Sequence, residues 1–324
     1  MVVRRWRALR VLGFVAFAAL VVALAGALLD RISTLNPNIP KIREMLALEH
    51  ETNAVIYIGD STTLDGVNPV EVESTLGLRG YNMASGGQSL LEAEMLLRNY
   101  LAHNARPRFV VLGLFVNRSD GARNMNPEIY FGLPGDLRDI MWRKANEQGM
   151  TNANLSFKLY NSVKAYRYRS NISYVLDYLH KHFVSHESRA SALVRGHLAL
   201  DYSKRQKPVT GAERSTAELN QAGLDSFLDF CEQQQLPVVM FEPPNTPGFS
   251  AITLSRETIL AAIAQRVANR KSVTFHSFND AGSLTYAPDE WSGRNHLNRK
   301  GAIRFTREQL VPYLREAQAS PAAR

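Results

Sequence analysis

The sequence contains one cysteine, Cys231, so no disulfide can form within the chain. Its setting, Phe227-Leu-Asp-Phe-Cys231, follows a helical pattern, and we interpret the thiol as a small buried apolar group. The lone cysteine does not assign a compartment, because a chain of 324 residues can bury a core large enough to need no covalent cross-link.

Signatures of nucleic-acid binding are also missing: there is no zinc-finger spacing, no RNA-binding motif and no long basic run. The formal net charge is +8, but Arg4, Arg5, Arg7 and Arg10 supply half of it from one end of the chain. The remaining charge has no pattern. We therefore predict a solvated basic surface and no nucleic-acid partner.

Cofactor motifs are absent as well. There is no Walker A loop, and Ser85-Gly-Gly-Gln88 is not a dinucleotide fingerprint, so we expect no cofactor. His182 and His186, with Glu187 adjacent, could present two imidazoles on one helical face, but the His-Glu-x-x-His pattern is missing and we predict no metal site. The other histidines outside the motifs below are scattered: His50, His103, His180, His197 and His276.

One long apolar run is present, at residues 11–29, between arginines and Asp30-Arg31. It is about long enough to cross a bilayer core of roughly 30 Å. The arginine excess predicts a cytoplasmic amino terminus, with the rest of the chain outside the plasma (inner) membrane, in the periplasm if the cell has one. A cleaved signal peptide is the alternative, because Ala23-Leu-Ala25 fits a cleavage pattern. We favour the retained single-pass anchor.

The chain has the composition of a folded protein, 45% hydrophobic and 21% charged, and strand and helix patterns alternate along it. We predict an α/β fold with a three-layer, doubly wound, mostly parallel five-stranded sheet. The expected strands are residues 54–58, 80–84, 108–116, 236–241 and 272–275. The expected helices are 69–76, 90–102, 216–235, 256–269 and 300–317.

We predict an anchor (or signal peptide) at residues 1–30, a linker at 31–53, a domain at 54–317 and a tail at 318–324. The strand and helix rhythm is lost at about 118–211, a stretch too long for an ordinary connection. Amphipathic pieces such as 172–183 favour a mainly helical insertion. A substrate platform, a structural cover or a docking surface for a membrane partner would each fit this insertion.

Two candidate catalytic residues, a serine and a histidine, lie in loops next to predicted secondary-structure elements. Gly59-Asp60-Ser61 follows the apolar strand at 54–58, and His296 precedes the last expected helix. Open α/β sheets place their chemistry at the carboxyl edge, and a serine with a histidine indicates nucleophilic catalysis.

Four blocks occur in order: Gly59-Asp60-Ser61, Asn82 with Gly87 beyond it, Gly113 leading to Asn117, and His296. With them the sequence resembles the SGNH superfamily, the GDSL-type hydrolases, over roughly residues 54–117 and 236–314. The anchor and the His-Leu-Asn-x-x-Gly-Ala run at 296–302 are similar to the cell-envelope members that add, move or remove acyl groups.

The resemblance implies a flavodoxin-like fold and a role for each matched residue. Ser61 would be the nucleophile and His296 its base. The backbone N–H groups of Ser61 and Gly87 and the side-chain amide of Asn117 would form the oxyanion hole. We expect Asp60 to support a catalytic residue or to fix the loop, and not to act on the substrate directly.

The sequence departs from the family pattern at two positions. The family usually carries Asp three residues before the histidine, and here that position is Gly293. Either Asp289 orients His296, or a backbone carbonyl does and the site is a dyad. At the second position, Arg118 follows Asn117, where the family usually has Asp. Gly86 is adjacent to Gly87, so the sequence does not decide which of the two glycines provides the oxyanion N–H.

We therefore expect a membrane-tethered serine esterase or O-acyltransferase. Its substrates would be acyl, most simply acetyl, esters of an envelope glycan or lipid-linked polymer, and a membrane-bound acyl donor protein is a candidate partner. A catalytically degenerate module that binds polysaccharide or a membrane partner is the alternative, since Gly293 replaces the usual Asp. A purely structural anchor would leave the serine and histidine motifs unexplained.

Overall fold

The computed structural model describes residues 2–32, 38–114, 125–150, 176, 191–200, 219–246, 255–280 and 283–319. The chain divides into two compact parts, Met1–Pro40 with Asn152–Ser188, and Lys41–Thr151 with Arg189–Arg324. The second part holds the sheet and all the matched motif residues that the structure describes.

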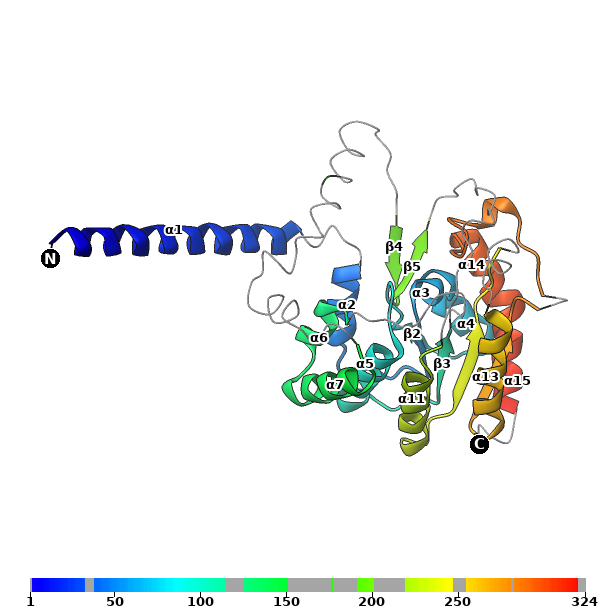
Figure 1. The fold of residues 1–324 in the computed structure, drawn as a ribbon. Helices are drawn as coiled ribbons and strands as arrows, with labels where there is room; N and C mark the ends of the chain where they lie inside the picture. Colours follow the sequence, from blue (N-terminus) through cyan, green and yellow to red (C-terminus); the bar gives the residue numbers. More distant parts are fainter. Residues whose placement is uncertain are drawn as a thin grey trace. The chain divides into compact units, whose positions relative to one another are not determined.

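Five parallel strands form the sheet of this second part, in the order β2-β1-β3-β6-β7 (Figure 1). Renumbered along the sheet this is the 2-1-3-4-5 order of flavodoxin-like folds, so the predicted fold class is confirmed. The strands are β1 Val55–Ile58, β2 Gly80–Asn82, β3 Phe109–Gly113, β6 Val238–Glu242 and β7 Val273–Ser277.

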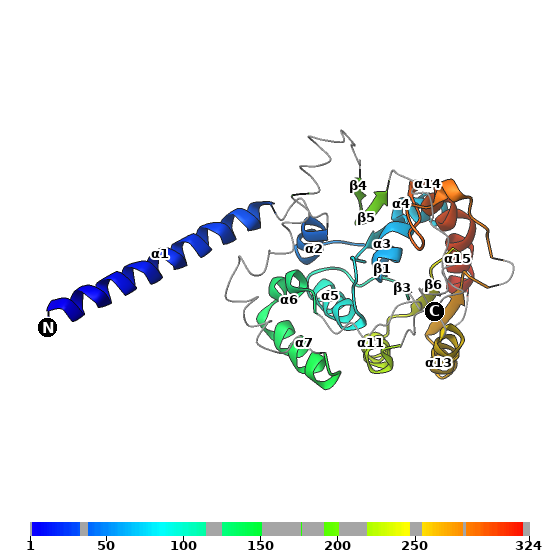
Figure 2. The same cartoon turned by 45° about the horizontal axis from the view of Figure 1, so that its top comes forward.

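The strands form where the sequence has short apolar, β-branched runs, because the central strands are buried on both faces. One face contributes Val55, Val111 and Phe241 to a core that also includes Phe305 and Leu314 of the closing helices. Helices α5 (Leu90–His103) and α11 (Gln221–Gln233) lie on the opposite side of the sheet (Figure 2). Helix α13, Arg256–Ala268, leads into β7.

Local signals set the helix ends. Helix α4, Pro69–Leu76, spans the predicted residues, with Asn68 as its cap and Pro69 at its first position. Helix α5 begins with a capping box between Ser89 and Glu92. The closing helix runs as α14, Arg299–Phe305, a π-helical turn, Thr306–Leu310, and α15, Val311–Ala319.

The described parts of the insertion contain two helices and a hairpin. Helices α6, Pro127–Gly132, and α7, Gly135–Glu147, follow β3, and α7 packs on α5. The antiparallel strands β4, Ser191–Val194, and β5, His197–Leu200, form a two-stranded sheet that the sequence did not predict. The amphipathic segment 172–183 lies outside the described residues except for Leu176.

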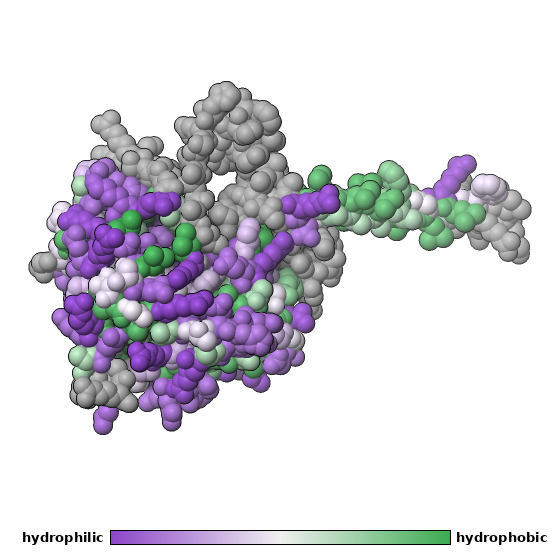
Figure 3. Space-filling model, turned by 180° about the vertical axis from the view of Figure 1, so that it is seen from behind, coloured by the Kyte–Doolittle hydropathy of each residue, from purple (hydrophilic) through white to green (hydrophobic). Residues whose placement is uncertain are grey.

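Helix α1, Val2–Ile32, contains the apolar run. Its segment Leu9–Arg31 has a mean hydropathy of 2.6 and is long and apolar enough to cross a membrane, although a signal sequence would pass the same test. Large apolar side chains are exposed along it, and Figure 3 shows them as a green band on this helix. Helix α2, Asn38–Leu46, follows within the segment 31–53 that we predicted as a linker.

Candidate active site

Ser61 begins a short helix directly after β1. The strand ends at Ile58, Gly59 turns with a φ of 152°, and Asp60 caps helix α3, Ser61–Gly66. The Asp60 carboxylate accepts hydrogen bonds from the backbone N–H and the hydroxyl of Thr62, at 2.9 and 2.6 Å. Asp60 therefore fixes the turn that presents Ser61 at the carboxyl edge of the sheet.

Two glycines allow this turn to lie close to the neighbouring strand. A Cβ at Gly59 would overlap Thr63 and lie 2.7 Å from the carbonyl oxygen of Gly113, and a Cβ at Gly113 would overlap Thr63 as well. Thr63 is fully buried between them. The Gly113 of the third motif block therefore makes room for the helix that begins with Ser61.

The loop after β2 is tied to the same turn. The backbone N–H of Ser85 donates to the carbonyl of Gly59 at 3.2 Å, and the side chain of Gln88 accepts from the N–H of Gly59 at 3.2 Å. Between them Gly87 has a φ of 69°, a conformation that glycine adopts without strain. The loop that contains Gly86 and Gly87 is therefore hydrogen-bonded to the turn that precedes Ser61, at the carboxyl edge of the sheet.

His296 lies in a closed loop ahead of α14. A β-bridge joins Trp291 to Leu297, and the carbonyl of His296 accepts from the N–H of Ser292 at 2.9 Å. The hydroxyl of Thr246, from the exit of β6, donates to the carbonyl of Arg294 at 2.9 Å. The loop that carries His296 is therefore fastened to the carboxyl end of the sheet.

The imidazole of His296 contacts a carboxylate that the sequence analysis did not single out. Its Nδ1 lies 2.7 Å from Oδ2 of Asp65, on α3. The side chain of Asp65 is 6% exposed and that of His296 is 28% exposed. Burial raises the pKa of Asp65 and the charge of Asp60 raises it further, while the hydrogen bond and charge of His296 oppose the shift.

The structure does not bear out the predicted role of Asp289. Its side chain is 64% exposed and its carboxylate lies 2.7 Å from Nζ of Lys300. That hydrogen bond lowers the pKa of Asp289. Gly293, the position of the family's usual acid, lies beside the ring of His296, where a Cβ would be 4.0 Å from Cβ and Cδ2 of His296. The carboxylate at Nδ1 therefore comes from Asp65, on a different element.

Helix spacing connects the pair to the serine. Ser61 and Asp65 are four residues apart in α3, so they lie on one helical face about one turn apart. His296 contacts Asp65 on that face, 231 residues further along the chain. The fold thus brings Ser61, Asp65 and His296 to one edge of the sheet. A search for an acid at helical spacing from Ser61 would have found Asp65.

The remaining residues that the sequence analysis named either lie outside the described residues or support the fold. Asn117 lies outside the described residues, as do His182 and His186. Asn82 is buried and its side chain binds the carbonyls of Thr63 and Val67, so it supports α3. Among the described residues, no group of three His, Cys, Asp or Glu side chains could hold a metal ion.

Comparisons with known proteins add little to this geometry. No family model matches the chain, and no curated protein matches it. Among solved structures the chain is similar to an acetyl xylan esterase, Est2A, from the rumen bacterium Butyrivibrio proteoclasticus, with a TM-score of 0.36 and 10% identity. The match covers 84% of this chain and 66% of that one, so the chain spans just under two thirds of that enzyme's length.

Proposed function

We propose that this chain is a membrane-anchored serine esterase or O-acyltransferase that forms an acyl-enzyme on Ser61. The observation that carries the proposal is the contact between His296 and Asp65 on the helix that Ser61 begins. A carboxylate at Nδ1 favours the imidazole tautomer whose Nε2 can accept a proton, which is what a serine nucleophile needs.

In the proposed reaction, Nε2 of His296 takes the proton of the Ser61 hydroxyl as Oγ attacks the carbonyl carbon of an acyl ester. The buried Asp65 carboxylate stabilises the imidazolium that forms. Collapse of the tetrahedral intermediate breaks the ester bond, and His296 returns the proton to the departing alcohol. Water or a second hydroxyl then attacks the acyl-enzyme, giving hydrolysis or transfer.

The start of α3 supports an oxyanion site. The carboxylate and carbonyl of Asp60 accept from the N–H groups of Thr62, Thr63 and Leu64. The first N–H groups of a helix have no acceptor within the helix, so that of Ser61 is suited to stabilise an oxyanion. The N–H of Gly87 and the side chain of Asn117 complete the proposed set, each donor lowering the barrier by roughly 3 kcal/mol.

The envelope setting rests on α1. We propose that it is retained as a single-pass anchor, with the domain in the periplasm or outside the cell. Acylated envelope glycans or lipid-linked polymers, with acetate as the simplest acyl group, are the proposed substrates. A membrane-bound acyl donor protein would be the partner for transfer. The alternative of a binding module without turnover drew its support from Gly293, and Asp65 at Nδ1 supplies the carboxylate that this position lacks.

The test uses the full chain in detergent with a fluorophosphonate probe and a chromogenic acetate ester. We expect the probe to label Ser61 and the ester to be turned over, with both lost in Ser61→Ala. Ser74→Ala is the matched control, because Ser74 is an exposed serine on the neighbouring helix α4. An added glycan acceptor separates transfer from hydrolysis. A wild-type protein with neither labelling nor turnover would contradict the proposal.

A further inference from the structure

The end of helix α3 is held by side chains from distant parts of the chain. The last carbonyl groups of a helix have no donor within the helix. In α3 the carbonyl of Asp65 lies 3.0 Å from Nε2 of His197, on β5 of the insertion. The carbonyl of Gly66 accepts from the hydroxyl of Thr306 at 3.3 Å, and Asn82 binds further carbonyls of the same turn. The backbone of Asp65 is therefore fixed from outside its own helix.

We propose that His197 is a positioning residue for the Asp65–His296 pair, and that the β4–β5 hairpin of the insertion delivers it to α3. By holding the Asp65 carbonyl, His197 fixes the rotation of the last turn of α3. That rotation aims the Asp65 carboxylate at Nδ1 of His296. This proposal rests on the proposed function for its catalytic consequence, but its structural part can be measured separately.

The chemistry of the contact defines the state of His197. A carbonyl oxygen can only accept, so Nε2 of His197 carries the proton and donates it. Burial lowers the pKa of His197 to about 4, and the positive charges of Arg299 and Lys41 lower it further, against the hydrogen bond to Asp65. His197 is thus a neutral donor at neutral pH. At 2% exposure it supports the site and does not reach a substrate.

The hairpin turn is built for close docking. Arg195 and Gly196 have φ values of 46° and 77°, the left-handed pair that tight hairpins use. The carbonyl of Arg195 accepts from the N–H of Asn82 at 2.9 Å, which ties the turn to the end of β2. A Cβ on Gly196 would overlap the carbonyl of Asn82 and Nζ of Lys41. The turn therefore approaches the sheet as closely as only glycine allows.

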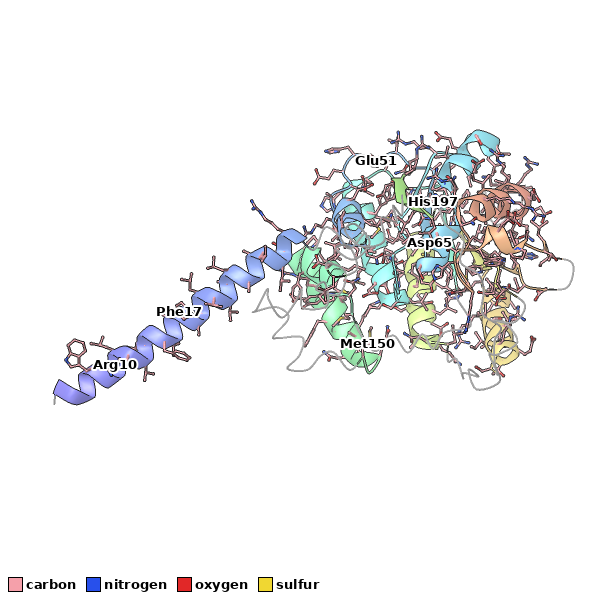
Figure 4. The ribbon with its side chains drawn as sticks, turned by 90° about the horizontal axis from the view of Figure 1, so that it is seen from above. Arg10, Phe17, Glu51, Asp65, Met150 and His197 are labelled. Atoms are coloured by element: carbon pink, nitrogen blue, oxygen red, sulfur yellow. The ribbon has the colours of Figure 1, made fainter. Side chains whose placement is uncertain are left out.

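These contacts place His197 directly against α3. Figure 4 shows His197 and Asp65 next to each other, one from the hairpin and one from the catalytic helix. The sequence separation of 132 residues explains why no local pattern marked this histidine. The β4–β5 hairpin of the insertion would thus stabilise α3, the helix that carries the proposed nucleophile and acid.

Three variants of the full chain in detergent test the proposal. His197→Gln keeps an N–H donor near the position of Nε2. His197→Leu removes the donor, and His197→Asn has a side chain too short for its amide to reach the carbonyl of Asp65. Val194→Ser, at an exposed position of the same hairpin, is the control. We expect His197→Leu and His197→Asn to lower kcat for the chromogenic ester roughly 10- to 100-fold with little change in KM. The glutamine variant and the control should stay near the wild type.

A second readout does not depend on turnover. The ¹⁵N chemical shifts of the His296 ring, assigned by comparison with His296→Gln, report its tautomer and its hydrogen bond to Asp65. We expect His197→Asn to change these shifts and His197→Gln to preserve them, even if no ester is turned over. Unchanged His296 shifts in a folded His197→Asn or His197→Leu protein would overturn the proposal. So would a glutamine variant as impaired as the other two.

Discussion

Replacing Asp65 by Asn separates the two candidate acids. Asn has almost the same shape, but its amide cannot stabilise an imidazolium, and its NH₂ group favours the tautomer that leaves no acceptor at Nε2 of His296. Because Oδ2 of Asp65 lies 2.7 Å from Nδ1, this is the contact that the substitution alters. We expect kcat to fall on the order of 10³- to 10⁴-fold. This corresponds to about 4–5 kcal/mol of barrier.

The same Asp65→Asn substitution should leave the folded protein as stable as the wild type or more stable, although it lowers kcat. Burial raises the pKa of Asp65, so the folded state disfavours the ionised carboxylate. A raised pKa means that the favourable contribution is complete below the unfolded value of 3.8 and is lost as the pH rises through the folded value. The Asn variant has no such loss. We expect it to melt at the same temperature as the wild type at pH near 4, and at the same or a higher temperature at pH 7.

The assay combines turnover of a chromogenic acetate ester with thermal unfolding of the full chain in detergent, at several pH values. Asp289→Asn is the matched control, because Asp289 is an exposed carboxylate in the same loop region with Lys300 as its partner. It should keep wild-type kcat and stability. The reasoning is refuted if Asp65→Asn keeps more than about a tenth of wild-type kcat. It is also refuted if Asp289→Asn is the variant that loses activity.

Three further predictions concern the loop after β2, the β4–β5 hairpin and the buried thiol of α11. Gln88→Leu leaves the N–H of Gly59 without its side-chain acceptor, so unfolding should become easier by about 1–3 kcal/mol and kcat should fall; a variant with wild-type melting and rates would contradict this. Gly196→Ala should undock the hairpin because of the overlap with Asn82, and hydrogen exchange at the N–H of Asn82 should accelerate; unchanged exchange would show that the turn adapts. Burial raises the pKa of the Cys231 thiol, so iodoacetamide should modify it only after denaturation, as followed by mass spectrometry.

The elements with local signals could be predicted from the sequence. Helix α4 begins and ends as expected, because Asn68 and Pro69 mark its start and Gly77 its left-handed end. Strand β1 was expected because a strand buried on both faces reads as a continuous apolar run. The position of Ser61 after that strand also followed. These features depend on neighbours within a few residues, which a single sequence displays.

The features that were missed depend on contacts between distant residues. Helix α3 reads Ser-Thr-Thr-Leu-Asp-Gly, a run with low helix propensity, and it forms because Asp60 caps one end and distant side chains hold the other. Asp65 was overlooked because α3 was not expected, so no acid was sought at helical spacing from Ser61, and its partner His296 lies 231 residues away. Asp289 was expected because it is the nearest acid upstream of Gly293, where the family's acid usually stands. Its carboxylate binds Lys300 instead.

If Asp65 and Ser61 act as proposed, the acid and the nucleophile share one helix, and the fold has to hold that helix in place. When the acid and the histidine share a loop, their geometry is set within a few residues. Here Asp65 moves with Ser61, and His296 comes from a separate loop, so the angle of one short helix sets both the serine and the carboxylate relative to the imidazole. A helix of six residues cannot hold that angle by its own hydrogen bonds. The donors from β2, β5 and the π-helical turn, which bind the last carbonyls of α3, are what such an arrangement requires.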